Sequence, residues 1–167
     1  MVVNNSRFDG SRFAVRDVQI ERVTTSESET QTVARELAAT LQAGDVLLLA
    51  GELGAGKTTF VRGLAEGLGI DPQAVSSPTF TLLHEYRGGR LTLYHADLYR
   101  LDRAATDDLG LDETGVRDGV LAIEWPERLT HVLQGARVIR LEVVSDDARR
   151  IAVGPPEGGP YDQGART

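Results

Sequence analysis

Apolar and polar positions along the chain follow two periods, one typical of strands and one of helices. Val46-Leu47-Leu48-Leu49-Ala50 is a continuous apolar run that predicts a buried strand. Residues 60–68 follow with apolar side chains at helical spacing. A second apolar run, Val120-Leu121-Ala122-Ile123, predicts another buried strand. Strands combined with amphipathic helices in this way indicate an α/β fold.

The residues before the first apolar run predict an edge strand and a helix. Residues 18–23 alternate between apolar and polar side chains, which predicts a strand at the edge of the sheet. Two overlapping capping boxes follow, one starting at Ser26 and the other at Ser28. The apolar stripe behind them predicts a helix over about 29–42, which ends before Gly44.

Two pairs of β-rich segments predict antiparallel hairpins. The β-rich end of residues 75–86 and residues 91–95 flank a Gly-Gly turn. Residues 137–144 and 149–153 flank a Ser-Asp-Asp turn. The sheet is therefore expected to be mixed rather than purely parallel. Between the two pairs, the acidic stretch 103–115 predicts one or two short helices.

Composition divides the chain into one domain and two tails. Residues 1–17 are polar and aperiodic and predict a flexible N-terminal extension. From residue 154 the chain turns to glycine, proline and polar residues, which predicts a disordered C-terminal tail over 154–167. The length of 167 residues suits a single domain, which we place at 18–153.

The stretch Gly51-Glu52-Leu53-Gly54-Ala55-Gly56-Lys57-Thr58-Thr59 fits the phosphate-binding pattern G-x-x-x-x-G-K-[ST]. A predicted strand before it and a predicted helix behind it provide the context that this motif requires. Loop amides and the helix N-terminus can then converge on phosphate oxygens. Lys57 adds a positive charge at the β- and γ-phosphates, and Thr58 offers a hydroxyl to Mg²⁺. Lys57 is also the only lysine of the chain.

The motif sets the expected fold class and the expected ligand contacts. We expect an α/β fold of the P-loop NTPase type, with three α/β/α layers, a mixed central sheet and antiparallel hairpins. Thr79 lies in a loop that reaches the γ-phosphate in switch-type NTPases. The predicted nucleotide-binding residues are Glu52, Leu53, Gly54, Ala55, Gly56, Lys57, Thr58, Thr59 and Thr79.

Hydrolysis or phosphoryl transfer needs an acid near the metal, at the end of another central strand. Glu124 directly follows the second apolar run and is the candidate for holding Mg²⁺ with Thr58; the alternative is a solvated carboxylate at a strand end. Asp97 follows another predicted strand and could orient the attacking water, or mark an ordinary strand exit. His95 could do the same work, although a single histidine at a strand end is more often structural.

Charge and composition narrow the partners and the compartment. The net charge is −7 and the longest basic stretch is Arg149-Arg150, so a nucleic-acid role is expected to act through a partner. There is no cysteine, no run of 18 apolar residues and no signal-peptide hydrophobic region. These features predict a cytoplasmic protein without a membrane span. No Asn-Lys-x-Asp guanine motif occurs, which favours adenine and therefore ATP.

Four blocks of sequence occur in order between residues 51 and 126. They are the loop motif through Arg62-Gly63, then Ser77-Pro78-Thr79-Phe80-Thr81-Leu82, then Tyr94-His95-x-Asp97-Leu98-Tyr99-Arg100-Leu101, then Ile123-Glu124-Trp125-Pro126. Together they resemble the TsaE family, also called YjeE, a small bacterial P-loop ATPase needed for threonylcarbamoyladenosine (t6A) synthesis on tRNA.

The resemblance implies an Mg²⁺-dependent ATPase required for the t6A modification of tRNAs that read ANN codons. It implies that the TsaB–TsaD complex transfers the group, and that the ATPase, weak alone, acts on that complex and meets tRNA only through it. The site residues that it implies are Lys57, Asp97 and Glu124 for catalysis, Thr58 and Glu124 for Mg²⁺, Thr59 and Thr79 near the γ-phosphate, and residues 28–30 near the adenine.

Two other functions stay open. A P-loop small-molecule kinase would need an arginine-bearing lid, for which Arg100, Arg103 and Arg117 are the candidates. A nucleotide-gated binding module, in which hydrolysis is incidental, would also fit an acidic chain that works through partners.

Overall fold

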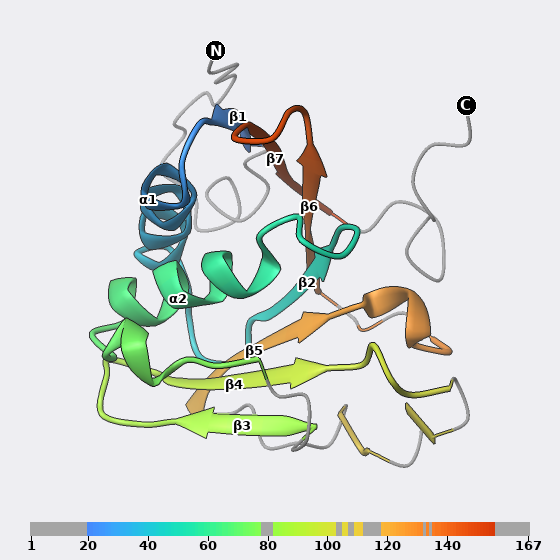
Figure 1. The fold of residues 1–167 in the computed structure, drawn as a ribbon. Helices are drawn as coiled ribbons and strands as arrows, with labels where there is room; N and C mark the ends of the chain where they lie inside the picture. Colours follow the sequence, from blue (N-terminus) through green and yellow to red (C-terminus); the bar gives the residue numbers. More distant parts are fainter. Residues whose placement is uncertain are drawn as a thin grey trace.

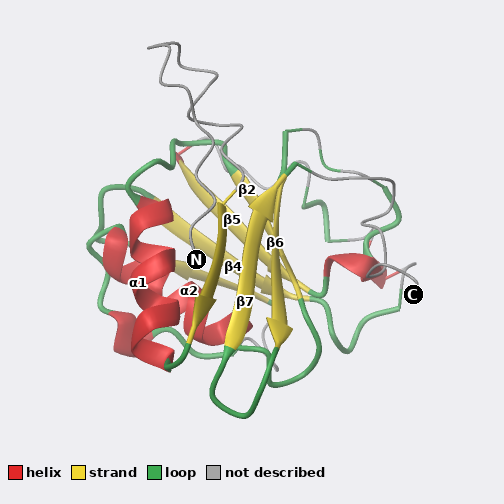
Figure 2. Cartoon of the chain, turned by 90° about the horizontal axis from the view of Figure 1, so that it is seen from above, coloured by secondary structure: helices red, strands yellow, loops and turns green. Residues whose placement is uncertain are grey.

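The computed structural model describes residues 20–77, 82–102, 105–106, 109–111, 118–131, 133 and 135–155. Among them, seven strands form one sheet, and the helices α1 and α2 pack on one of its faces (Figures 1 and 2). The elements are β1 (Ile20–Thr24), α1 (Glu27–Ala38), β2 (Val46–Ala50), α2 (Lys57–Gly67), the 3₁₀ turn η1 (Pro72–Ala74), β3 (Leu83–Tyr86), β4 (Thr92–Asp97), β5 (Gly119–Glu124), the 3₁₀ turn η3 (Pro126–Arg128), β6 (Arg137–Val143) and β7 (Arg149–Gly154).

The sheet is mixed, as predicted, with the strand order β1-β7-β6-β2-β5-β4-β3. The four middle strands β6, β2, β5 and β4 run parallel to one another. The hairpins β3–β4 and β6–β7 are antiparallel, and β1 lies at one edge of the sheet beside β7. These parallel strands all point their carboxyl ends toward the same edge, where ligands bind in α/β sheets.

Both faces of the sheet are buried, so the α/β fold class is confirmed. One apolar cluster fills the space between the sheet and the two helices. A second cluster covers the opposite face, where Leu98, Leu111, Leu129 and Leu133 pack over residues of the central strands. These side chains come from the segments that follow β4 and β5, so the described part of this outer layer is largely irregular chain with the turn η3. The predicted helices of residues 103–115 lie mostly outside the described residues.

Helix α1 begins earlier than the predicted residue 29 because Ser26, rather than Ser28, is its N-cap. The Ser26 hydroxyl accepts a hydrogen bond from the Glu29 amide at 3.1 Å. The Glu29 carboxylate in turn accepts the amide of Thr25 at 2.6 Å. Two donors at the start of the helix are satisfied in this way, which fixes its first turn.

The same helix ends at Ala38, earlier than the predicted residue 42. Arg90, from the turn before β4, donates hydrogen bonds to the carbonyl oxygens of Ala38 at 2.8 Å and Leu41 at 3.1 Å. The Ala38 carbonyl oxygen also accepts the Leu41 amide at 3.2 Å, so Arg90 adds a second donor to it at the end of the helix. At the other end of the chain, β7 runs to Gly154, one residue past the predicted domain boundary. Residues 1–19 and 156–167, where the two tails were predicted, lie outside the described residues.

No helix in the described part of the chain is long and apolar enough to cross a membrane.

The two α-helices pack tightly against each other through small residues. A Cβ placed on Gly63 would lie 2.5 Å from the Gln31 carbonyl oxygen and 2.6 Å from the Ala34 Cβ. One placed on Gly67 would lie 2.6 Å from the Ala38 Cβ. The helices approach this closely only because both α2 positions lack a side chain, and the close packing sets where the first turn of α2 lies.

We expect Gly63→Ala to destabilise the fold, although alanine favours helix more than glycine does by about 1 kcal/mol. The added methyl group meets backbone atoms that cannot yield cheaply, so α1 and α2 must separate. Urea denaturation should show a net loss of about 1–3 kcal/mol in the free energy of unfolding.

The matched control is Glu66→Ala on the exposed side of the same helix. It removes only a half-exposed ion pair with Arg35 and should cost less than about 1 kcal/mol. A Gly63→Ala protein at least as stable as Glu66→Ala would contradict the close packing of the two helices.

Candidate nucleotide-binding site

The loop between β2 and α2 has the backbone geometry of a phosphate-binding loop. Gly54 and Gly56 have φ angles of 81° and 101°, in the left-handed region that glycine adopts without strain. Gly51 lies so close to β6 that a Cβ there would be 2.6 Å from the Leu141 carbonyl oxygen. Gly56 is also the N-cap of α2, so the loop passes directly into the helix, whose positive end favours anions.

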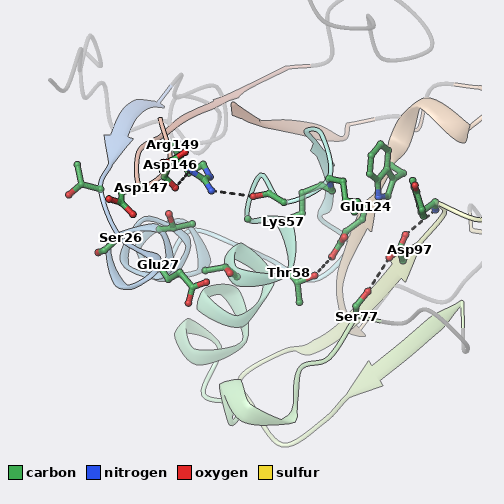
Figure 3. Close-up of a pocket in the computed structure, with 18 of the residues that line it drawn as sticks. Ser26, Glu27, Lys57, Thr58, Ser77, Asp97, Glu124, Asp146, Asp147 and Arg149 are labelled. Carbon is green, nitrogen blue, oxygen red and sulfur yellow. Dashed lines mark hydrogen bonds between the residues drawn. The ribbon is translucent and has the colours of Figure 1, made fainter. Parts of the chain in front are cut away.

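A cavity of about 650 Å³ opens over this loop (Figure 3). Three parts of the chain form its wall. The loop and the start of α2 contribute Leu53, Gly54, Gly56, Lys57, Thr58 and Thr59. The ends of β4 and β5 and the residues near them contribute Ser77, Asp97, Tyr99, Arg100, Glu124 and Trp125. The start of α1 and the turn between β6 and β7 contribute Thr25, Ser26, Glu27, Thr30, Asp146, Asp147 and Arg149.

Glu124 and Thr58 are in contact at the cavity wall. The Thr58 hydroxyl donates a hydrogen bond to Glu124 Oε1 at 3.1 Å. Glu124 is 3% exposed and ends β5, which pairs with β2 so that Leu49 and Glu124 are register partners. The same Oε1 atom accepts a second hydrogen bond, at 2.8 Å, from His95 Nε2. The sheet thus carries the carboxylate to the first turn of α2, although the two residues are far apart in sequence.

This pair of oxygen donors suits Mg²⁺. The ion prefers oxygen ligands and usually keeps waters or substrate phosphates in its remaining positions, so one or two protein groups suffice. The hydroxyl of Thr58 and the carboxylate of Glu124 are such groups and already lie in contact. Among the described residues there is no cluster of three or more histidine and acidic side chains of the kind that holds a metal without substrate.

Asp97 lies beside Glu124 at the end of the neighbouring strand, since the two are register partners in the β4–β5 pair. It is 7% exposed. Its Oδ1 accepts the Tyr99 amide at 2.9 Å, and its Oδ2 accepts the Ser77 hydroxyl at 3.2 Å. Two donors therefore hold this carboxylate at the cavity wall (Figure 3).

The Lys57 ammonium lies between the loop and an aromatic ring. Lys57 is 5% exposed, and its Nζ donates hydrogen bonds to the carbonyl oxygens of Gly51 and, at 2.9 Å, Glu52. The same atom lies 4.0 Å from the centre of the Trp125 ring, a cation–π contact. Among the described residues, Trp125 is the non-glycine residue with a positive φ, at 61°, and such strained conformations gather at functional sites. The Tyr99 ring packs on Trp125 with centroids 4.7 Å apart.

Burial lowers the pKa of Lys57 below its ordinary value of 10.5. Loss of hydration disfavours the charged ammonium, and this effect is larger than the opposing pull of the neighbouring carboxylates. The carboxylates that raise the pKa are those of Glu124, Glu127, Asp97 and Glu52, in that order of effect. The neighbouring carboxylates therefore offset only part of the cost of burying this ammonium.

Most of the site residues expected from sequence line this one cavity. They are Leu53, Gly54, Gly56, Lys57, Thr58, Thr59, Asp97 and Glu124. Glu52 and Ala55 belong to the loop but not to the cavity wall, and Ala55 is fully buried in the core. Thr79 lies outside the described residues. Of residues 28–30, expected near the adenine, Thr30 lines the cavity.

Sequence reasoning did not place several other residues of the wall in the site. Trp125 and Tyr99 stand in the sequence blocks without a predicted role, although each lies close in sequence to a predicted acid. Asp146, Asp147 and Arg149 carry no local signal, because only the order of the strands brings the β6–β7 turn to the cavity. There Arg149 donates a hydrogen bond to the Gly54 carbonyl oxygen at 3.3 Å.

A strand, glycine-rich loop and helix, with a lysine in the loop and an acid at the end of the adjacent parallel strand, define a P-loop protein. The family model described as "Threonylcarbamoyl adenosine biosynthesis protein TsaE" matches residues 24–151. The chain therefore belongs to the TsaE family.

Individual relatives agree with the family assignment. The tRNA threonylcarbamoyladenosine biosynthesis protein TsaE of Bacillus subtilis is 46% identical over 134 residues, which cover 80% of this chain and 84% of the relative. The protein of the same name from Treponema pallidum is 50% identical over 117 residues, which cover 68% of this chain and 84% of the relative. The crystal structure of YdiB from B. subtilis superposes with a TM-score of 0.64 at 40% identity, covering 81% of this chain and 84% of that one.

The buried ammonium of Lys57 predicts an observable pKa. Because it is the only lysine, isotope-labelled lysine gives a single side-chain signal in NMR spectra. We expect the titration midpoint of the folded protein to lie below 10.5, and that of the urea-unfolded protein to return toward 10.5.

Glu124→Gln should lower the midpoint further, because it removes the carboxylate that raises the Lys57 pKa most. Exposed Glu142, on β6, supplies the control, and Glu142→Gln should leave the midpoint unchanged. A folded-state midpoint at or above 10.5 would contradict the burial of the ammonium.

Proposed function

We propose that this protein is an Mg²⁺-dependent ATPase required for the t6A modification of tRNAs that read ANN codons. In this proposal it hydrolyses ATP on behalf of a TsaB–TsaD complex, which transfers the threonylcarbamoyl group. The observation that carries the proposal is the contact of Thr58 with Glu124 in a cavity whose wall also contains Lys57 and Asp97, in a chain of the TsaE family.

The loop and the start of α2 are suited to hold the phosphates of ATP. Backbone amides at the start of a helix lack intrahelical partners and can donate to phosphate oxygens. The flexible side chain of Lys57 would exchange its loop carbonyls and the Trp125 face for the β- and γ-phosphate oxygens, which are stronger partners for an ammonium. Thr59, also in the first turn, lies at the cavity wall near this end.

Thr58 and Glu124 would hold Mg²⁺ at the phosphates. When bound, the ion would supply positive charge that neutralises the oxygens of the β- and γ-phosphates. The two side chains reach this position from different elements, α2 and β5.

Asp97 is the proposed acceptor for the attacking water. Its carboxylate is held by the Tyr99 amide and the Ser77 hydroxyl, and it faces the same cavity as Lys57 (Figure 3). It would orient the water and take up a proton as the oxygen attacks the γ-phosphorus and the bond to the bridging oxygen breaks. The products are ADP and inorganic phosphate.

The nucleoside would lie at the other end of the cavity. The start of α1 and the β6–β7 turn form this part of the wall, with hydroxyl groups from Ser26 and Thr30 and carboxylates from Glu27 and Asp146. Hydroxyls and carboxylates suit the ribose and the exocyclic amine of adenine. Figure 3 shows Ser26, Glu27 and Asp146 on the side of Lys57 away from Glu124 and Asp97. The proposed adenine position therefore includes the predicted residues 28–30 only through Thr30.

The proposed partners are proteins rather than tRNA itself. A net charge of −7 disfavours direct grip on a polyanion. Leu53 is 74% exposed and Tyr99 is 42% exposed, and both lie at the cavity wall, where apolar surface is available to a protein partner. We place the protein in the cytoplasm, where tRNA modification by such a complex would occur.

The proposal is tested by measuring phosphate release from ATP with and without purified TsaB–TsaD. We expect slow hydrolysis by the protein alone and stimulation by the complex, both dependent on Mg²⁺. Lys57→Ala should abolish nucleotide binding and with it both activities. Phosphate appearing on a metabolite would favour a kinase, and unstimulated binding without hydrolysis would favour a binding module; either outcome would overturn the proposal.

Asp97→Ala separates binding from hydrolysis. Because Asp97 acts on the water and not on the phosphates, the variant should bind ATP nearly as well as the wild type but hydrolyse it about 10²–10⁴-fold more slowly. Single-turnover hydrolysis and equilibrium binding measure the two effects.

Asp118→Asn is the matched control. Asp118 lies just before β5, at the opposite end from Glu124, and accepts a hydrogen bond from the Tyr94 hydroxyl at 2.9 Å. Its loss should leave hydrolysis unchanged. Equal hydrolysis by Asp97→Ala and the wild type would exclude the role proposed for Asp97.

A further inference from the structure

His95 is a buried polar residue for which the proposed hydrolysis has no use. It lies on the central strand β4, between β5 and β3, and is 0% exposed. Its Nε2 atom lies 2.8 Å from Glu124 Oε1. Its other ring nitrogen, Nδ1, is buried and has no hydrogen-bond partner. The side chain therefore makes its one polar contact with the predicted metal ligand.

The direction of this hydrogen bond follows from the chemistry of the two groups. An ionised carboxylate only accepts hydrogen bonds, so Nε2 must carry the hydrogen and donate it to Glu124. Oε1 then accepts two hydrogen bonds, from His95 at 2.8 Å and from the Thr58 hydroxyl at 3.1 Å. Two donors from two different elements restrict the rotation of a long side chain that would otherwise be flexible. Carboxylates that ligate metals are commonly oriented by such neighbours.

The unpaired Nδ1 atom indicates what the residue is for. A buried nitrogen without a partner destabilises a folded protein, and an apolar side chain of similar size would avoid that cost. Stability alone therefore does not account for a histidine at this position. What the histidine contributes is the hydrogen bond from its Nε2 atom to Glu124.

We propose that His95 is a positioning residue that holds Glu124 in its metal-binding orientation through the Nε2–H hydrogen bond. Mg²⁺ then strengthens nucleotide binding only while this hydrogen bond is present. The inference rests on the proposed function, because it assumes that Glu124 and Thr58 bind Mg²⁺ together with ATP. His95 itself touches neither the metal nor the nucleotide.

The test compares nucleotide affinity with Mg²⁺ and with EDTA, measured by calorimetry with a non-hydrolysable ATP analogue. In the wild type, Mg²⁺ should tighten binding. His95→Asn, whose shorter amide cannot reach Glu124, should reduce the Mg²⁺-dependent gain by roughly 10- to 100-fold. His95→Gln can place its amide nitrogen near the position of Nε2 and should restore most of the gain. In EDTA all three proteins should bind the analogue equally.

Tyr94→Phe is the matched control, because it alters the neighbouring residue of β4 and loses a hydrogen bond to Asp118 far from Glu124. It should keep the wild-type response to Mg²⁺. His95→Leu adds a second test. Circular dichroism should show that this variant is folded, and calorimetry should show the same loss of the Mg²⁺-dependent gain in affinity as in His95→Asn.

The outcomes separate the two levels of the proposal. If the wild type responds to Mg²⁺ and His95→Asn responds equally, the positioning role is wrong and the metal site stands. If His95→Asn loses affinity equally in Mg²⁺ and in EDTA, the residue is merely structural and the inference is also wrong. If Mg²⁺ does not affect the wild type at all, both the inference and the proposed metal site are overturned.

Discussion

The parallel pairing of β5 with β2 on one side and β4 on the other is the constraint on which the site depends. Backbone hydrogen bonds fix Glu124 beside Leu49 and beside Asp97, at the edge where the loop leaves β2. Because side chains alternate between the faces of a strand, a slip of one residue would turn Glu124 toward the opposite core. The fully buried sequence of β5 prevents such a slip, since it would bring a carboxylate into the apolar cluster. Core packing thus determines the position of the acid.

The charges of the site depend on one another. Lys57, Glu124 and Asp97 are each less than a tenth exposed, so none is stabilised mainly by water. Two carboxylates against one ammonium leave an excess of negative charge where a phosphate would have to bind. A phosphate alone would be repelled by these acids, and a divalent cation alone would lack ligands. The arrangement therefore favours the two arriving together, as the proposed binding of a nucleotide with a metal ion requires at so acidic a site.

The features that the sequence predicts correctly are those whose signals lie close together along the chain. Strand β2, the loop and helix α2 are contiguous, and both hairpins are marked by turn residues. Glu124 follows an apolar run, and Asp97 follows one arm of a predicted hairpin, so local signals also indicate these two strand ends. The end of α1 was predicted too late. Beyond Ala38 the backbone hydrogen bonds join residues three apart, and Arg90, distant in sequence, binds the carbonyl oxygens of Ala38 and Leu41. The β6–β7 turn was missed because strand order alone brings it to the cavity. The contact of Lys57 with Trp125 needs a positive φ that no sequence rule assigns to tryptophan.

The single lysine has a consequence for the covalent chemistry of the chain. Every other side chain with a permanent positive charge is arginine, so any reagent or enzyme that acylates lysine side chains has one target, the 5% exposed ammonium of the loop. Acylation there would remove the charge from the phosphate site. Reagents that cross-link, biotinylate or acetylate lysine side chains find no lysine on the outer surface to modify, unlike in lysine-rich proteins. For this molecule, any modification of a lysine side chain therefore alters the candidate phosphate-binding loop.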